Sequence, residues 1–88
     1  DIRKSAVQIV RATREKEELE YGASPRASIN LVLASKGRAL VENQNHVSMK
    51  DVKTMAKPVL RHRIGLSFSA EKKGLNPDDV IEEIVEDL

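Results

Sequence analysis

The chain has 88 residues, which is enough for one small domain but too few for a domain plus a separate catalytic module. It contains no cysteine, so its own residues can form neither a disulfide framework nor a thiolate metal site. Fifteen Lys and Arg against 14 Asp and Glu give a net charge of +1, well short of the strongly basic balance of a dedicated nucleic-acid-binding protein.

The sequence also lacks the features of a membrane or exported protein. No apolar run approaches the roughly 18 to 20 residues that a membrane span needs, and no signal-peptide pattern is present. We therefore expect no membrane association. The absence of cysteine fits a reducing compartment, so we expect a cytoplasmic location. The chain begins at Asp1 without an initiator methionine and enters a helical pattern at once, so we expect it to be a fragment of a longer protein.

The N-terminal part predicts one helix followed by a loop. Residues 2–16 carry apolar side chains at helical spacing, which is typical of an amphipathic helix with one buried stripe. Residues 15–22 are acidic, contain few apolar side chains and end on a glycine. For this segment we expect a frayed helix end that passes into an exposed loop.

The segment from Pro25 to Glu42 predicts the central helix. Its apolar positions cover more than one side of a helical cylinder, so we expect neighbours to cover it on several sides. Gly37 in its interior costs about 1 kcal/mol relative to alanine, and a close approach by another helix would explain it. Asn43-Gln44-Asn45 then favours a turn.

The C-terminal part predicts two helices and a short strand. Ser48 and Asp51 form the pattern of a capping box, and Pro58 predicts a kink or a restart, with one helix to Lys57 and a second piece through Arg63. The alternation over residues 64–68 predicts a strand paired with residues 46–48. The run Asn76-Pro77-Asp78-Asp79 predicts the start of a last helix.

Together these elements predict an all-α fold. We expect a single domain over residues 1–88, built as a small four-helix bundle with at most a minimal two-stranded β pairing. One Phe, one Tyr and no Trp leave the core to aliphatic side chains.

A candidate phosphate-binding site lies at the start of the central helix. Ser24 can cap this helix, Pro25 suits its first position, and Arg26 places a guanidinium in its first turn. A helix N-terminus favours an anion, and an arginine can grip phosphate oxygens through two donors. A cap followed by proline is also a common way to start a helix, so a purely structural role stays open.

Other candidate groups give weaker signals. His46 and His62 lack metal-ligand spacing, so no metal site is predicted. Arg61-His62-Arg63 either contacts a phosphate or acidic partner, or is solvated at a helix end. Glu82 and Glu86 have no neighbour that would shift a pKa for acid–base catalysis. No Gly-x-x-x-x-Gly-Lys-Ser/Thr loop exists, so the chain alone cannot cradle a nucleoside triphosphate.

The charges are unevenly distributed along the chain. From Arg26 to Arg63, eight Lys and Arg stand against two Asp and Glu, a net charge of +6, whereas the tail after Lys73 carries only acids. Two explanations fit this pattern. The basic and acidic segments can form solvated helix faces that partly neutralise each other, or the basic segment can form a surface that faces a polyanion. The residues alone leave open a small helical nucleic-acid-binding module that uses this basic middle, and a structural protein-interaction bundle.

Four segments together resemble the C-terminal lid of MoxR-family AAA+ ATPases. They are Ile9–Glu15, Gly22–Ser28, Val47–Lys53 and Pro58–Ile64, and they occur in the family's order over nearly the whole chain. Gly-Ala-Ser-Pro-Arg-Ala combined with Val-Leu-Arg-His-Arg is much more specific than either motif alone. The loop at residues 43–46 departs from the Gly-Arg-Asp-Tyr-like turn that is common in the family.

The resemblance implies an AAA+ lid-type bundle and a role for one residue. In this family the arginine of the first motif is the sensor 2 residue, which implies that Arg26 is catalytic and contacts the γ-phosphate of ATP, with Ser24 and Pro25 beside it. ATP and Mg²⁺ would be held mainly by a separate core domain of the same chain, and the lid alone should be inactive.

The resemblance also implies partners. Related ATPases form rings, usually of six subunits, so neighbouring subunits are expected to contact this domain. A von Willebrand factor A-domain protein is a frequent partner in chaperone-like remodelling. Nucleic acid is not an expected partner on this reading.

Overall fold

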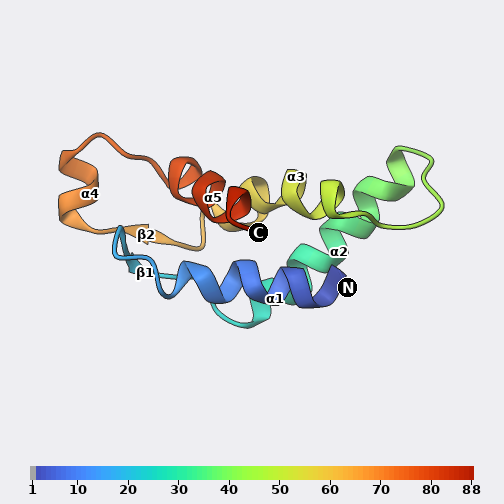
Figure 1. Cartoon of the computed structure of the whole chain (residues 1–88), viewed down its shortest axis with the longest axis horizontal. Coiled ribbons are helices and arrows are strands. Elements are labelled where there is room, and N and C mark those ends of the chain that lie inside the picture. Colours follow the sequence, from blue (N-terminus) through green and yellow to red (C-terminus); the bar gives the residue numbers. More distant parts are fainter. Residues whose placement is uncertain (1) are drawn as a thin grey trace.

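The computed structural model describes residues 2–88, which form five helices and a two-stranded antiparallel sheet (Figure 1). The elements are α1 (Ile2–Thr13), β1 (Leu19–Tyr21), α2 (Arg26–Val41), α3 (Met49–Leu60), β2 (Gly65–Leu66), α4 (Phe68–Lys72) and α5 (Pro77–Glu86). The molecule is elongated, 43 × 21 × 20 Å, with the sheet and α4 at one end and the loop after α2 at the other. No helix among the described residues has the length and apolar character that crossing a membrane would require.

The predicted fold class is confirmed. Four helices of 10 to 16 residues build the bundle, and the small β pairing is present. The fifth helix, α4, has five residues and is not predicted by the sequence pattern. Ser67 starts α4 by accepting a hydrogen bond from the backbone N–H of Ala70 at 3.1 Å, so the strand predicted over residues 64–68 stops at Leu66.

The partner predicted for this strand is wrong. β2 pairs with β1 and not with residues 46–48, so the segment expected to be a frayed helix end or loop contains a strand. Leu19 of β1 is buried in the core, and the Tyr21 side chain lies against Gly65. One buried leucine in a three-residue strand is too short a signal for periodicity to detect.

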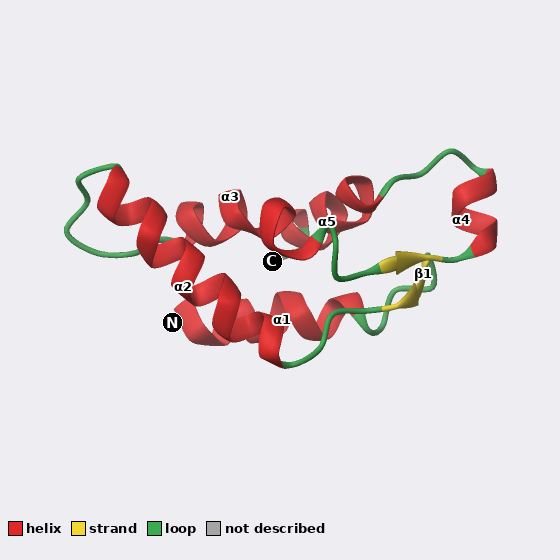
Figure 2. Ribbon diagram, turned by 180° about the vertical axis from the view of Figure 1, so that it is seen from behind, coloured by secondary structure: helices red, strands yellow, loops and turns green. Residues whose placement is uncertain are grey.

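Four helices, α1, α2, α3 and α5, enclose one aliphatic core. Its largest fully buried apolar side chains are Ile9, Val10, Leu31, Val52, Leu60 and Ile81. Figure 2 shows α2 crossing α1 and passing α3, so that its last turns project beyond the other helices. The helix that carries Arg26 is therefore packed in the bundle along only part of its length.

The prediction that neighbours cover α2 on several sides is wrong. One face packs on α1 and α3, and its buried residues are Ala27, Leu31, Ser35 and Ala39. On the opposite face Ile29, Leu33 and Leu40 are 59%, 60% and 77% exposed. Gly37 lies in open space, since a Cβ there would meet nothing within 4 Å, and no other helix among residues 2–88 approaches it closely. The apolar pattern is real, but residues 2–88 supply no element that covers this second face.

The restart predicted at Pro58 is not observed. α3 continues through Pro58 to Leu60, and Arg61 is its C-cap residue. Proline removes the hydrogen bond that its N–H would donate to the carbonyl of Thr54, and its ring crowds that carbonyl. Both residues are exposed on the solvent side of α3, where water can hydrate that carbonyl. The helix therefore tolerates a proline in its last turn.

The capping box predicted at Ser48 is present, and the cap predicted at Asn76 is part of a second capping box. The Ser48 N–H donates to Asp51 Oδ2 at 2.8 Å, and Asn76 and Asp79 exchange bonds of 2.9 and 3.0 Å. Asp51 is completely buried and also accepts a hydrogen bond from the Arg38 guanidinium of α2. The hydrogen bond from the Ser48 N–H is the largest cause that lowers the pKa of Asp51, and the hydrogen bond from Arg38 lowers it further. Burial alone would raise this pKa, but the net shift is downward.

Replacing Asp51 should have a pH-dependent effect on stability. The pKa of Asp51 in the folded state lies below the unfolded value of about 3.9. The Asp51 carboxylate therefore stabilises the fold fully above the unfolded pKa, and this stabilisation is lost as the pH falls through the folded pKa. Asp51→Asn should lower the melting temperature at pH 7, and the gap from the wild type should narrow at about pH 3. Glu86→Gln, which removes an exposed carboxylate, is the control and should change little at either pH. A gap of equal size at both pH values would contradict this account.

Candidate functional site

Thr13 holds the segment Gly22–Arg26 against the end of α1. The Thr13 side chain is completely buried, and its hydroxyl donates to the carbonyl of Val10 at 2.6 Å and accepts the backbone N–H of Ala23 at 2.9 Å. One hydroxyl therefore ties the last turn of α1 to the loop that leads into α2.

Gly22 is required by a close backbone contact. A Cβ at this position would lie 2.4 Å from the Thr13 carbonyl oxygen and 2.6 Å from the Arg14 nitrogen. Both are backbone atoms, so neither can turn aside as a flexible side chain could. Ala23 and Ala27 are fully buried, which favours small side chains at both positions. Three residues of the Gly-Ala-Ser-Pro-Arg-Ala motif are thus explained by packing.

The other three residues of the motif, Ser24, Pro25 and Arg26, are exposed. Pro25 occupies the N-cap position of α2, and no side chain caps the helix there. The expected cap from the Ser24 side chain is not observed among residues 2–88. Instead, the backbone carbonyl of Ser24 accepts a hydrogen bond from the N–H of Ala27 at 2.9 Å. The backbone carbonyl of Pro25 accepts one from the N–H of Ser28 at 3.1 Å. Because these two N–H groups are satisfied within the chain, the Arg26 guanidinium is the strongest candidate for binding an anion at this site.

Arg26 has no partner within the described part of the chain. Its guanidinium makes no hydrogen bond or ion pair with any of residues 2–88. Three other cations of the basic middle are paired, in the couples Arg38–Asp51, Lys57–Glu82 and Arg61–Asp78. An exposed arginine on an anchored helix start is therefore free to bind an external anion.

Arg61, His62 and Arg63 do not act as one cluster. Arg61 binds Asp78 through two donors, with Nε to Oδ1 at 3.1 Å and Nη2 to Oδ2 at 3.0 Å. This pair joins the end of α3 to the first turn of α5. His62 and Arg63 are exposed, so Arg61 differs from its neighbours in being held by an ion pair within the domain.

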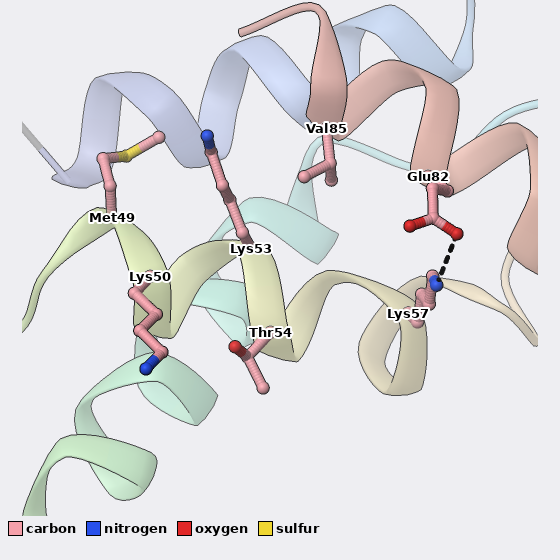
Figure 3. A pocket seen from close by; sticks show the side chains of 7 residues that line it. All are labelled: Met49, Lys50, Lys53, Thr54, Lys57, Glu82 and Val85. Atoms are coloured by element: carbon pink, nitrogen blue, oxygen red, sulfur yellow. Dashed lines mark hydrogen bonds and ion pairs between the residues drawn. The ribbon is translucent and has the colours of Figure 1, made fainter.

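An open groove of about 490 Å³ lies between α3 and α5 (Figure 3). Met49, Lys53 and Val85 project toward it. Lys57 donates to Glu82 Oε2 at 2.9 Å, and this hydrogen bond raises the pKa of Lys57. Nowhere in the described chain do three His, Cys, Asp or Glu side chains come together to hold a metal ion. The groove does not include Arg26 and offers no set of groups for catalysis.

Comparison with known proteins decides the family. The model of the AAA lid domain family matches residues 11–84. The chain belongs to this family. This AAA lid domain is 35% identical to "Chaperone MoxR1" of Mycobacterium tuberculosis (strain ATCC 25618 / H37Rv), over 91% of the chain and 24% of the relative. It is 32% identical to "Uncharacterized protein YeaC" of Bacillus subtilis (strain 168), over 96% of the chain and 26% of the relative.

A solved structure supports the same assignment. The crystal structure of a "putative ATPase" from Cytophaga hutchinsonii (ATCC 33406) matches 99% of the lid domain and 29% of that chain, with a TM-score of 0.89 and 33% identity. The lid domain spans about a quarter of the length of the curated relatives that it matches. The resemblance inferred from the motifs is confirmed at the level of the family.

One residue that positions the site was not recognised from the sequence. Thr13 appears in the pattern only as one member of the buried stripe of α1. The available signal was a hydroxyl residue on an otherwise apolar face, shortly before a Gly-Ala pair. Its role depends on a hydrogen bond to a backbone N–H ten residues away, which periodicity cannot reveal.

Two glycine substitutions should have opposite effects on the lid domain. Gly22→Ala should lower the free energy of unfolding by about 1–3 kcal/mol, because its Cβ meets backbone atoms. Gly37→Ala should raise that free energy by about 0.5–1 kcal/mol, because the helix interior there is open. Urea unfolding of both variants measures the difference, and effects of the same sign would contradict the structure.

Proposed function

We propose that this lid domain senses the γ-phosphate of ATP bound to the core of a full-length AAA+ ATPase, with Arg26 as the sensor 2 residue. The observation that carries the proposal is the exposed Arg26 guanidinium, which has no partner within residues 2–88. It stands at the start of a 16-residue helix whose entry is fixed by Thr13. An arginine that has no ion-pair partner, and that stands on a helix start held in place by hydrogen bonds, is suited to recognising an external anion.

The physical effect follows from the fork geometry of arginine. Two parallel donors on phosphate oxygens give a charge-assisted contact of about 1.5 to 3 kcal/mol. A closed position of the lid is then favoured about ten- to a hundredfold when the third phosphate is present. Hydrolysis removes the phosphate that Arg26 holds, so the lid is released in a hinge-type movement.

Other parts of the proposal concern the parent protein. Residues 2–88 contain no phosphate-binding loop and no acidic cluster suited to a cation, so ATP and Mg²⁺ would be held mainly by the core domain. Neighbouring subunits of a six-membered ring, a von Willebrand factor A-domain partner and chaperone-like work in the cytoplasm complete the proposal. The name of the relative Chaperone MoxR1 agrees with chaperone-like work.

The structure gives less support to nucleic-acid binding. Three of the eight cations of the basic middle are paired within the domain. The exposed face of α2 presents aliphatic side chains, whereas a recognition helix presents basic and amide side chains.

Substituting Arg26 in the full-length ATPase tests the proposal. Arg26→Ala should lower ATP turnover about ten- to a hundredfold, because the transferred phosphate loses its charge-assisted contact. Arg26→Lys should recover only part of this loss, since an ammonium cannot bind phosphate as a fork. Steady-state ATP hydrolysis by both variants provides the measurement.

Lys73→Ala is the control for this experiment. It removes one exposed positive charge near α4, away from Arg26, and should leave turnover unchanged. Circular dichroism should show that every variant is folded. A folded Arg26→Ala protein with normal turnover and normal nucleotide-dependent assembly would refute the sensor assignment.

A further inference from the structure

The groove between α3 and α5 has an excess of positive charge. Its charged lining residues are Lys50, Lys53, Lys57 and Glu82, which give a net charge of +2. Glu82 pairs with Lys57 at 2.9 Å. Lys50 and Lys53 are exposed and make no hydrogen bond or ion pair with any of residues 2–88. The groove therefore offers two unpaired ammonium groups to an external carboxylate.

Apolar side chains lie beside these cations. Met49 precedes Lys53 by about one turn of α3, and Val85 of α5 lines the same groove (Figure 3). Met49 and Val85 are only partly buried by the domain. A methionine side chain is flexible and adapts to the shape of a binding partner. One ligand can therefore pair a charge with Lys53 and at the same time pack apolar groups against Met49 and Val85.

The spacing of the lysines favours a helical ligand. Lys50, Lys53 and Lys57 recur at intervals of three and four residues, so they share one face of α3. From Met49 to Lys57 this face extends about 12 Å, which is about two turns of a second helix. Carboxylates at the same spacing on that helix would lie opposite successive lysines. This arrangement is a form of helix-in-groove recognition.

We propose that the groove between α3 and α5 binds an acidic, amphipathic helix of a partner protein. Carboxylates of that helix pair with Lys50 and Lys53, and its apolar side chains pack on Met49 and Val85. The groove does not include Arg26, so this proposal does not rest on the sensor role.

Charge complementarity decides which partner fits. A neutral apolar segment would cover the two ammonium groups without supplying a countercharge, and a basic segment would be repelled by them. A nucleic acid fits less well, because its phosphates would meet the Glu82 carboxylate and it has no aliphatic side chains to pack on Met49 and Val85. An acidic amphipathic helix satisfies both the charged and the apolar parts of the groove.

Fluorescence anisotropy with the full-length ATPase tests this inference. The probe is a fluorescein-labelled peptide of about 15 residues, or about four helical turns, with Leu on one face and Glu on the other. One control peptide carries Gln in place of every Glu. A second contains the same Leu and Glu residues in an order that forms no apolar face. The Leu–Glu peptide should bind at least about tenfold more tightly than either control.

Variants of the ATPase locate the binding in the groove. Lys53→Glu should weaken binding of the Leu–Glu peptide at least about tenfold, because a peptide carboxylate then meets a like charge. Met49→Gln should weaken it about three- to tenfold through loss of apolar contact. Lys73→Glu is the matched control, because it reverses one exposed charge near α4, at the end of the molecule away from the groove, and should leave binding unchanged (Figure 1). Circular dichroism should show that every variant is folded.

Several results would overturn the proposal. They are undetectable binding of the Leu–Glu peptide, equal binding to the Lys53→Glu and Lys73→Glu variants, and equally tight binding of the Gln peptide. A single-stranded DNA oligonucleotide that displaces the peptide, and that binds Lys53→Glu more weakly than Lys73→Glu, would identify a nucleic-acid surface and would also overturn it. Arg26→Ala should bind the peptide as the wild type does, so the sensor role and this binding site succeed or fail separately.

Discussion

The position of the candidate site depends on one buried hydroxyl. The connection from α1 to α2, residues 14–25, is long enough to leave the start of α2 poorly placed unless something fixes it. Thr13 fixes it by bonding to α1 and to Ala23 at the same time, and Gly22 allows the backbones to meet. The Thr13 hydroxyl both donates and accepts a hydrogen bond, so burying it costs little free energy. The result is an arginine whose guanidinium makes no hydrogen bond or ion pair with residues 2–88 and yet stands at a defined helix start.

Some of the charges that are segregated along the sequence are paired in space. The acidic α5 supplies Glu82 to Lys57 and Asp78 to Arg61, and thereby joins the ends of α3 and α5. Arg38 pairs with the buried Asp51, which joins α2 to α3. The basic middle is thus partly neutralised by the acidic end of the same chain, as expected for faces that balance each other. Three of the eight cations of the basic middle are paired in this way, and Arg26 is not among them.

Local signals in the sequence were sufficient to predict the four long helices and their starts. The capping box of Ser48 and the cap of Asn76 depend on contacts within three residues, so the sequence shows them directly. Contacts between distant residues could not be predicted in this way. They include the pairing of β1 with β2, the hydrogen bond from Ala23 to Thr13 and the partner of Arg61. The motif placed Arg26 correctly at a helix start, but only the structure shows that its guanidinium is left without a partner.

The error about α2 shows why apolar pattern and burial are different quantities. The sequence states that α2 is apolar on two faces, but it cannot state which molecule covers each face. Within the domain one face is covered, and the other begins with Arg26 and continues through Leu33 to Leu40. Burial of the first face follows from the helices that residues 2–88 provide, whereas the second face is apolar without being buried by any of these residues. Apolar periodicity therefore predicts which faces of a helix can be buried, and the arrangement of the neighbouring elements decides which of them is.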